Sequence, residues 1–100
     1  MKDIIIRSIN MEATGSRINE LRKAKGLTVE QLAEYVGTSQ QAVYKWQAGK
    51  TLPTLDNIFI LCDIFQVNVE DIVIREDGKS SFDFVLFENF IGGMVYEALY

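Results

Sequence analysis

The chain has 100 residues, of which 48% are hydrophobic and 24% charged, enough for one domain with a packed core. It contains no histidine and one cysteine. This excludes the usual zinc sites, the Ser-His-Asp and Cys-His catalytic arrangements and an internal disulfide. No apolar run reaches the roughly 18 residues of a membrane span, and the first residues do not form a secretory signal. We therefore expect a cytoplasmic protein that is not an enzyme, enters no membrane and needs no metal or cofactor.

Charge is distributed unevenly along this sequence. Ten basic and fourteen acidic side chains give a net charge of −4, which taken alone argues against binding to polyanions. Residues 14–53 carry six basic and three acidic side chains, a net of +3, whereas residues 54–100 carry two basic and nine acidic ones, a net of −7. A polyanion responds to the local charge, because charges beyond about 8–10 Å are largely screened. The basic segment therefore suits DNA phosphates, although an ordinary helix surface can carry the same small excess.

Caps and apolar spacing predict five short helices, a pattern typical of a compact all-α domain. We expect them at residues 11–25, 28–36, 40–47, 54–65 and 68–74. Asn10, Ser39 and Thr54 are expected to cap helices, Thr28 forms a capping box with Gln31, and Gly26 and Gly37 end helices. In the fourth helix the expected inward face is Leu55, Ile58, Phe59, Cys62 and Phe65.

The second and third helices have the layout of a helix-turn-helix. They are about eight residues long and joined by a tight turn, at which Gly37 is expected to adopt a positive φ. The third helix would then enter the DNA major groove, with Val43 and Trp46 facing the core. Its exposed side is predicted to be Ser39, Gln40, Gln41, Tyr44 and Lys45. Glutamine can donate to and accept from adenine at once, and lysine can reach guanine or a phosphate, which makes these residues candidates for base contact.

The run from about residue 11 to 74 resembles the Cro/C1-type (XRE-family) helix-turn-helix regulators. The matching motifs are Leu21-Arg22, Gly26-Leu27-Thr28, Leu32-Ala33, Gly37-Thr38-Ser39, Trp46-Gln47-Ala48-Gly49-Lys50, Pro53 and Val67-Asn68. The resemblance implies a five-helix, lambda-repressor-like DNA-binding domain that acts as a dimer on a near-palindromic operator. The pair Gln40-Gln41 is similar to that of lambdoid phage repressors, in which such glutamines touch bases. Lys50 and Thr51 are expected to meet phosphates, because the loop after the recognition helix runs beside the DNA backbone in this fold.

Three positions depart from the family pattern. Phage repressors have glutamine where this chain has Val29, so a phosphate contact there must come from backbone N–H groups or Thr28. The family often pairs the first-helix arginine with a glutamate, but Arg22 would meet Gln47, which leaves the guanidinium freer to contact a phosphate. Gln66 replaces a common glycine, so that helix end is either less sharply capped or mildly strained.

The two ends of the chain lie outside the family pattern. Residues 1–10 contain three consecutive isoleucines, which suit a short strand or an arm. Residues 76–100 form a C-terminal extension, and thirteen of the twenty residues from 81 to 100 are apolar or aromatic. A helix apolar on nearly all sides needs burial on more than one side. We expect this segment to form the homodimer interface; the alternatives are that it wraps its own domain or, as in an antitoxin, binds a partner protein.

The sequence as a whole predicts a three-part chain. Residues 1–10 form an arm, residues 11–75 the helix-turn-helix domain and residues 76–100 a dimerisation segment. The predicted function is a sequence-specific transcriptional regulator, a repressor, that binds double-stranded DNA through residues 40–47.

Overall fold

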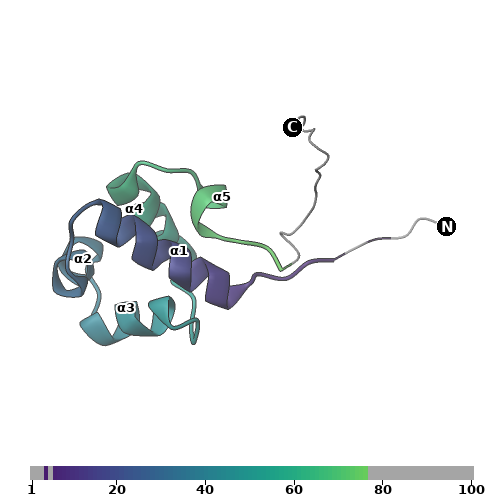
Figure 1. Cartoon of the computed structure of the whole chain (residues 1–100), viewed down its shortest axis with the longest axis horizontal. Coiled ribbons are helices and arrows are strands. Elements are labelled where there is room, and N and C mark those ends of the chain that lie inside the picture. Colours follow the sequence, from purple (N-terminus) through teal and green to yellow (C-terminus); the bar gives the residue numbers. More distant parts are fainter. Residues whose placement is uncertain (1–3, 5, 77–100) are drawn as a thin grey trace, which may run out of the picture. The chain divides into compact units, whose positions relative to one another are not determined.

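The computed structural model describes residues 4 and 6–76, which contain five helices and no strand (Figure 1). The helices are α1 (Met11–Ala24), α2 (Val29–Val36), α3 (Gln40–Gln47), α4 (Leu55–Phe65) and α5 (Val69–Ile72). They fall within one compact unit, Ile9–Ile74. The predicted five-helix architecture is therefore confirmed, with α1 and α5 slightly shorter than expected.

Side-chain caps start the helices where the sequence predicts. Asn10 Oδ1, Ser39 Oγ and Thr54 Oγ1 accept hydrogen bonds from the backbone N–H three residues on, in α1, α3 and α4. At α2 the Thr28 hydroxyl accepts from the N–H of Gln31, and the Gln31 side chain accepts from the N–H of Thr28. Each bond satisfies a donor that the first turn of a helix otherwise leaves unpaired, so these caps fix the helix boundaries locally.

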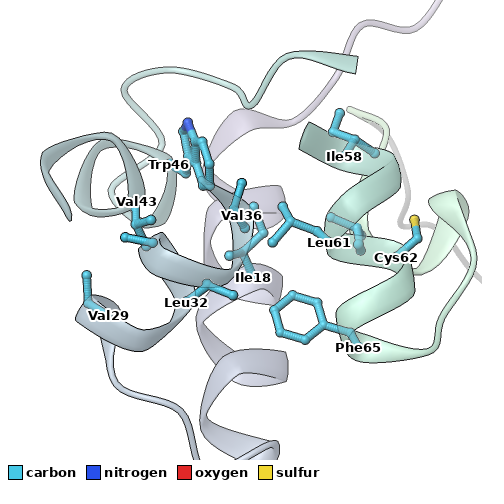
Figure 2. Close-up of a cluster of buried hydrophobic side chains, with 12 residues drawn as sticks. Ile18, Val29, Leu32, Val36, Val43, Trp46, Ile58, Leu61, Cys62 and Phe65 are labelled. Carbon is cyan, nitrogen blue, oxygen red and sulfur yellow. The ribbon is translucent and has the colours of Figure 1, made fainter. Parts of the chain in front are cut away.

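The core consists of apolar side chains contributed by all five helices. Ile18, Leu32, Val43, Leu61 and Ile72 are fully buried at its centre. Figure 2 shows α4 side chains pointing toward those of α1 and α2. Removal of these apolar side chains from water is the main favourable contribution to folding.

Cys62 belongs to this core, as the sequence predicts for a small buried hydrophobic residue. Burial raises the pKa of its thiol, and the negative charge of Asp63 adds to the effect. The thiol therefore stays protonated and unreactive at neutral pH.

The outward face of α4 differs from the prediction. Ile58, Cys62 and Phe65 are buried as expected, but Leu55 and Phe59 are 65% and 53% exposed. Leu61, which the predicted face omits, is fully buried instead. The five predicted residues span a wide arc of the helix, and α4 is rotated about its axis so that the arc centred on Phe65 packs on the core.

The α4 helix ends in a strained residue. Gln66 has φ 59° and ψ 50°, and it is the only non-glycine residue with a positive φ among those described. Its N–H donates to the carbonyl of Cys62 and closes the last turn. The sequence left open whether this helix end is weakly capped or strained, and the structure supports strain.

The start of α1 is tied to the segment after α5. The N–H of Asn10 donates to the carbonyl of Ile74 at 2.7 Å, and the N–H of Ile74 donates to the hydroxyl of Thr14 at 3.0 Å. Thr14 is 1% exposed, so this bond satisfies a buried hydroxyl that the sequence analysis did not single out. The first and last parts of the compact unit are thereby held together.

The described residues outside this unit are few. Residues 4 and 6–8 carry neither helix nor strand, and Ile9 lies in an isolated β-bridge. The N–H of Glu76 donates to the carbonyl of Ser8 at 2.7 Å. The predicted dimerisation or partner-binding segment, residues 81–100, lies outside the described residues.

Candidate nucleic-acid interface

A tight turn sets the angle between α2 and α3. Gly37 has φ 86°, as its position predicts, and both Gly37 and Thr38 donate their N–H groups to the carbonyl of Ala33 at 2.9 Å. Ala33 is 3% exposed, and its small side chain lets the two helices approach each other. The arrangement is that of a helix-turn-helix with α3 as its second helix.

The α3 helix has one buried side and one exposed side. Val43 is fully buried and Trp46 is 5% exposed, so both belong to the core as predicted (Figure 2). The opposite side is exposed to solvent and carries the expected residues: Ser39, Gln40, Gln41, Tyr44 and Lys45. An exposed α3 about 12 Å long suits insertion into the major groove.

The other predicted contact residues lie at the ends of the helix-turn-helix. Thr28 is exposed at the N-cap of α2, next to the backbone N–H groups of the first turn. Lys50 and Thr51 are exposed just after α3, and both donate their backbone N–H to the carbonyl of Lys45. Their side chains are therefore carried by a loop with fixed backbone geometry.

Close packing also fixes α3 against α1. A Cβ added to Gly15 would collide with the carbonyl oxygens of Trp46 and Gln47, so only glycine permits this approach. In the loop just after α3, Gly49 has φ 74° and packs against the backbone of Glu12 in α1. The α3 helix and the loop after it thus rest on the backbone of α1.

For Arg22, the sequence predicted a neutral hydrogen bond to Gln47 and a guanidinium freer to contact a phosphate. Its Nε donates to Gln47 Oε1 at 2.9 Å, so the predicted neutral pair is confirmed. The guanidinium is not free to reach a phosphate, however, because Nη1 donates to the carbonyl of Leu27 at 2.6 Å and Nη2 to Asn19 Oδ1 at 2.8 Å. The planar fork of donors matches three acceptors of the protein at once, and Arg22 therefore holds α1, α3 and the loop before α2 together.

A hollow of about 340 Å³ beside the start of α3 was not anticipated. It is lined by Glu30, Ala33, Glu34, Thr38, Ser39 and Gln40. The two glutamates are one helical turn apart on α2, and they line the hollow together with Ser39 and Gln40. The cations of Lys45 and Lys50, by contrast, lie toward the other end of α3. The spacing of Glu30 and Glu34, four residues apart, was the sequence signal that could have indicated an acidic patch on this face of α2.

The described residues contain no helix that is both long and apolar enough to cross a membrane. They also contain no cluster of side chains suited to holding a metal ion.

A family model described as helix-turn-helix matches residues 18–72 of the sequence. The chain therefore belongs to the Cro/C1-type helix-turn-helix regulators. This family consists of regulators rather than enzymes. The match covers the whole of α2, α3, α4 and α5, including every residue on the exposed side of α3.

Individual proteins of known name support the same assignment. The chain is 33% identical over 61 residues to the HTH-type transcriptional activator BcrR of Enterococcus faecalis. The aligned region covers 61% of this chain and 30% of BcrR. It is 30% identical to the restriction-modification controller protein C.AhdI of Aeromonas hydrophila, with a TM-score of 0.59 over 63% of this chain and 96% of that one. It is 27% identical to the P22 c2 repressor, solved with a synthetic operator, with a TM-score of 0.57 over 59% and 89% of the two chains.

The first of these relatives is much longer than the shared region. The chain spans 30% of the length of BcrR, so the likeness concerns the helix-turn-helix domain. The chain has a helix-turn-helix domain of the type found in transcriptional regulators.

Proposed function

We propose that this protein is a sequence-specific transcriptional repressor of the cytoplasm that binds a near-palindromic operator as a homodimer. The observation that carries the proposal is the exposed side of α3, on which Gln40, Gln41, Tyr44 and Lys45 face solvent while Val43 and Trp46 anchor the helix in the core. The solved P22 c2 repressor, similar over 59% of this chain, was crystallised with an operator, which supports DNA as the ligand.

The side chains of the interface divide into two roles. The amides of Gln40 and Gln41 and the ammonium group of Lys45 contact base edges, because they can form the paired hydrogen bonds that distinguish bases in the major groove. The sugar–phosphate backbone is contacted from the two ends of the helix-turn-helix by Thr28, Ser39, Lys50 and Thr51. Tyr44 packs against the same DNA backbone. Phosphate contacts set the position of α3, and base contacts select the sequence.

Two copies are needed for useful affinity and specificity. One domain of this size covers little DNA, and two recognition helices must lie about one helical turn, roughly 34 Å, apart to read two half-sites. We propose that residues 81–100, thirteen of which are apolar or aromatic, hold the two copies together. Repression then follows from occupation of the operator.

Selection of binding sites from a pool of random duplexes tests the proposal. The proposal predicts enrichment of an inverted repeat, and reduced transcription of a reporter that carries the selected site at its promoter. No enrichment of any sequence would refute DNA recognition, whereas enrichment of a single unrepeated site would refute symmetric binding. Increased transcription of the reporter would assign activation instead of repression.

A further inference from the structure

The N-terminal arm carries the most exposed apolar side chains among the residues that the structure describes. Ile4 is 81% exposed and Ile6 is 88% exposed, whereas the next large apolar residue, Tyr35, is 66% exposed. Isoleucine favours strands, and its exposure is a cost that a partner surface relieves. The composition of the arm is therefore that of a strand, although residues 4 and 6–8 belong to none.

Two hydrogen bonds show which backbone edge of the arm faces its own chain. The carbonyl of Ser8 accepts from the N–H of Glu76 at 2.7 Å. The N–H of Asn10 donates to the carbonyl of Ile74, also at 2.7 Å. This is the pattern of an antiparallel bridge, and the arm makes it with even-numbered residues. Because the backbone groups of successive residues in an extended chain point to opposite edges, the other edge belongs to the odd-numbered residues.

This division of the backbone limits how two arms can pair. In an antiparallel pair, residues that lie opposite each other either both bond across the pair or both point away from it. Two copies of the arm can therefore pair only with odd-numbered residues opposite odd-numbered ones. The two-fold symmetric registers that keep the isoleucines together are then centred on position 4, 5 or 6.

The charges of the arm favour one of these registers. A centre at position 5 places Asp3 opposite Arg7 of the second copy, and Ile4 opposite Ile6. A centre at position 4 places Asp3 opposite Ile5, and a centre at position 6 places Arg7 opposite Ile5. Opposite charges that face each other across two strands stabilise the pair. The guanidinium of Arg7 has several N–H donors, so it can bind this carboxylate together with groups of its own chain.

We propose that two copies of this chain join their N-terminal arms as antiparallel strands centred on position 5. Ile4 and Ile6 of both copies then lie on one face of the pair, because side chains alternate along a strand. The symmetry uses the odd-numbered edge once in each copy, so the assembly stops at two. A ribbon of two strands is marginally stable alone, and the arms therefore add to the contact proposed for residues 81–100. The inference rests on the proposed homodimer but not on DNA recognition.

Single cysteine substitutions test the register in the full chain and without DNA. Ile4→Cys, Ile5→Cys and Ile6→Cys are each oxidised with diamide, and cross-linked dimers are measured on non-reducing gels. The unchanged chain gives the background, because its own Cys62 is buried. A disulfide needs Cα atoms less than about 7 Å apart, a distance that directly opposite residues satisfy and diagonal neighbours exceed.

We expect Ile5→Cys to cross-link with itself. An equimolar mixture of Ile4→Cys and Ile6→Cys should cross-link at least about fivefold more than either variant alone. Self-cross-linking of Ile4→Cys or of Ile6→Cys would place the centre at position 4 or 6 and overturn the inference. A dimer in sedimentation without cross-links above background would overturn it as well and leave the proposed homodimer standing. A full chain that sediments as a monomer would refute both.

A charge exchange tests the ion pairs between the arms. Asp3→Arg places like charges opposite each other and should weaken the dimer by about tenfold in sedimentation equilibrium. Adding Arg7→Asp exchanges the two charges and should restore the affinity to within about twofold of the unchanged chain. Lys2→Asp is the control, because position 2 faces Ser8 in this register and its charge should matter by less than about twofold. Failure of the exchanged variant to recover would refute the register.

Discussion

Arg22 Nε donates a hydrogen bond to Gln47 Oε1 at 2.9 Å, and this bond joins the last turn of α1 to the last residue of α3. The two other nitrogens of the guanidinium hold Asn19 and the carbonyl of Leu27. The orientation of α3 thus depends on a half-buried side-chain network as well as on the apolar core.

Substitutions of Gln47 test this network. Gln47→Ala leaves the Arg22 Nε donor without its acceptor and should lower the free energy of unfolding by about 1–2 kcal/mol. Gln47→Glu supplies a charged acceptor at the same position and should raise that free energy by about 1 kcal/mol. Urea denaturation measures both. Gln41→Ala, on the exposed side of the same helix, is the control and should change stability by less than about 0.5 kcal/mol. Equal effects of Gln47→Ala and Gln41→Ala would show that the bond contributes nothing.

Gly15 tests the close approach of α1 and α3. Alanine is better than glycine inside a helix by about 1 kcal/mol, so an exposed site would be stabilised. At position 15 the added methyl group meets the carbonyl oxygens of Trp46 and Gln47, and we expect Gly15→Ala to destabilise the fold by about 1–3 kcal/mol and to weaken DNA binding. Ser16→Ala, at the exposed neighbouring position, serves as the control in thermal unfolding. A more stable Gly15→Ala variant would contradict the packing described.

Gln66 tests the strained end of α4. Glycine adopts a positive φ without the steric cost that a side chain pays, although it loses more backbone entropy on folding. Gln66→Gly should therefore raise the free energy of unfolding by about 0.5 kcal/mol, visible as a higher urea midpoint with an unchanged slope. Gln66→Val should lower it by about 1 kcal/mol or more, because a β-branched side chain tolerates this conformation poorly. If valine were tolerated as well as glycine, the left-handed conformation at residue 66 would be refuted.

The features that depend on neighbouring residues in the sequence were predictable. The caps at Asn10, Thr28 and Ser39 and the positive φ of Gly37 follow from rules that involve only a few adjacent residues. The exposed side of α3 was predictable for a related reason, since Val43 and Trp46 fix which side of the helix faces the core.

Features that depend on how helices pack were not predictable in the same way. Leu55 and Phe59 fit a helical apolar pattern. The rotation of α4 about its own axis, however, depends on the side chains that α4 packs against. That rotation buries Leu61 and leaves Leu55 and Phe59 exposed. The three acceptors of Arg22 come from different segments of the chain. The acidic hollow beside Gln40 likewise exists only because α2 and α3 meet at this angle.

Removal of residues 80–100 tests the proposed source of dimerisation. These residues carry the concentrated apolar segment of the sequence, so the shortened chain should sediment as a monomer where the full chain is a dimer. Its helical circular dichroism should persist, because the five described helices end at Ile72. A dimer of unchanged mass after the deletion would refute the role of this segment.

The most direct test of base reading by α3 compares Gln40→Ala with Lys50→Ala on the selected operator and on duplexes with single base changes, over a range of salt concentrations. Gln40→Ala should reduce discrimination at one base position by about 1–3 kcal/mol and leave the salt dependence unchanged. Lys50→Ala should weaken binding to all sequences alike and reduce the slope of log affinity against log salt by about 0.9. Equal, sequence-independent losses in both variants would contradict the assignment of α3 as the helix that reads the bases.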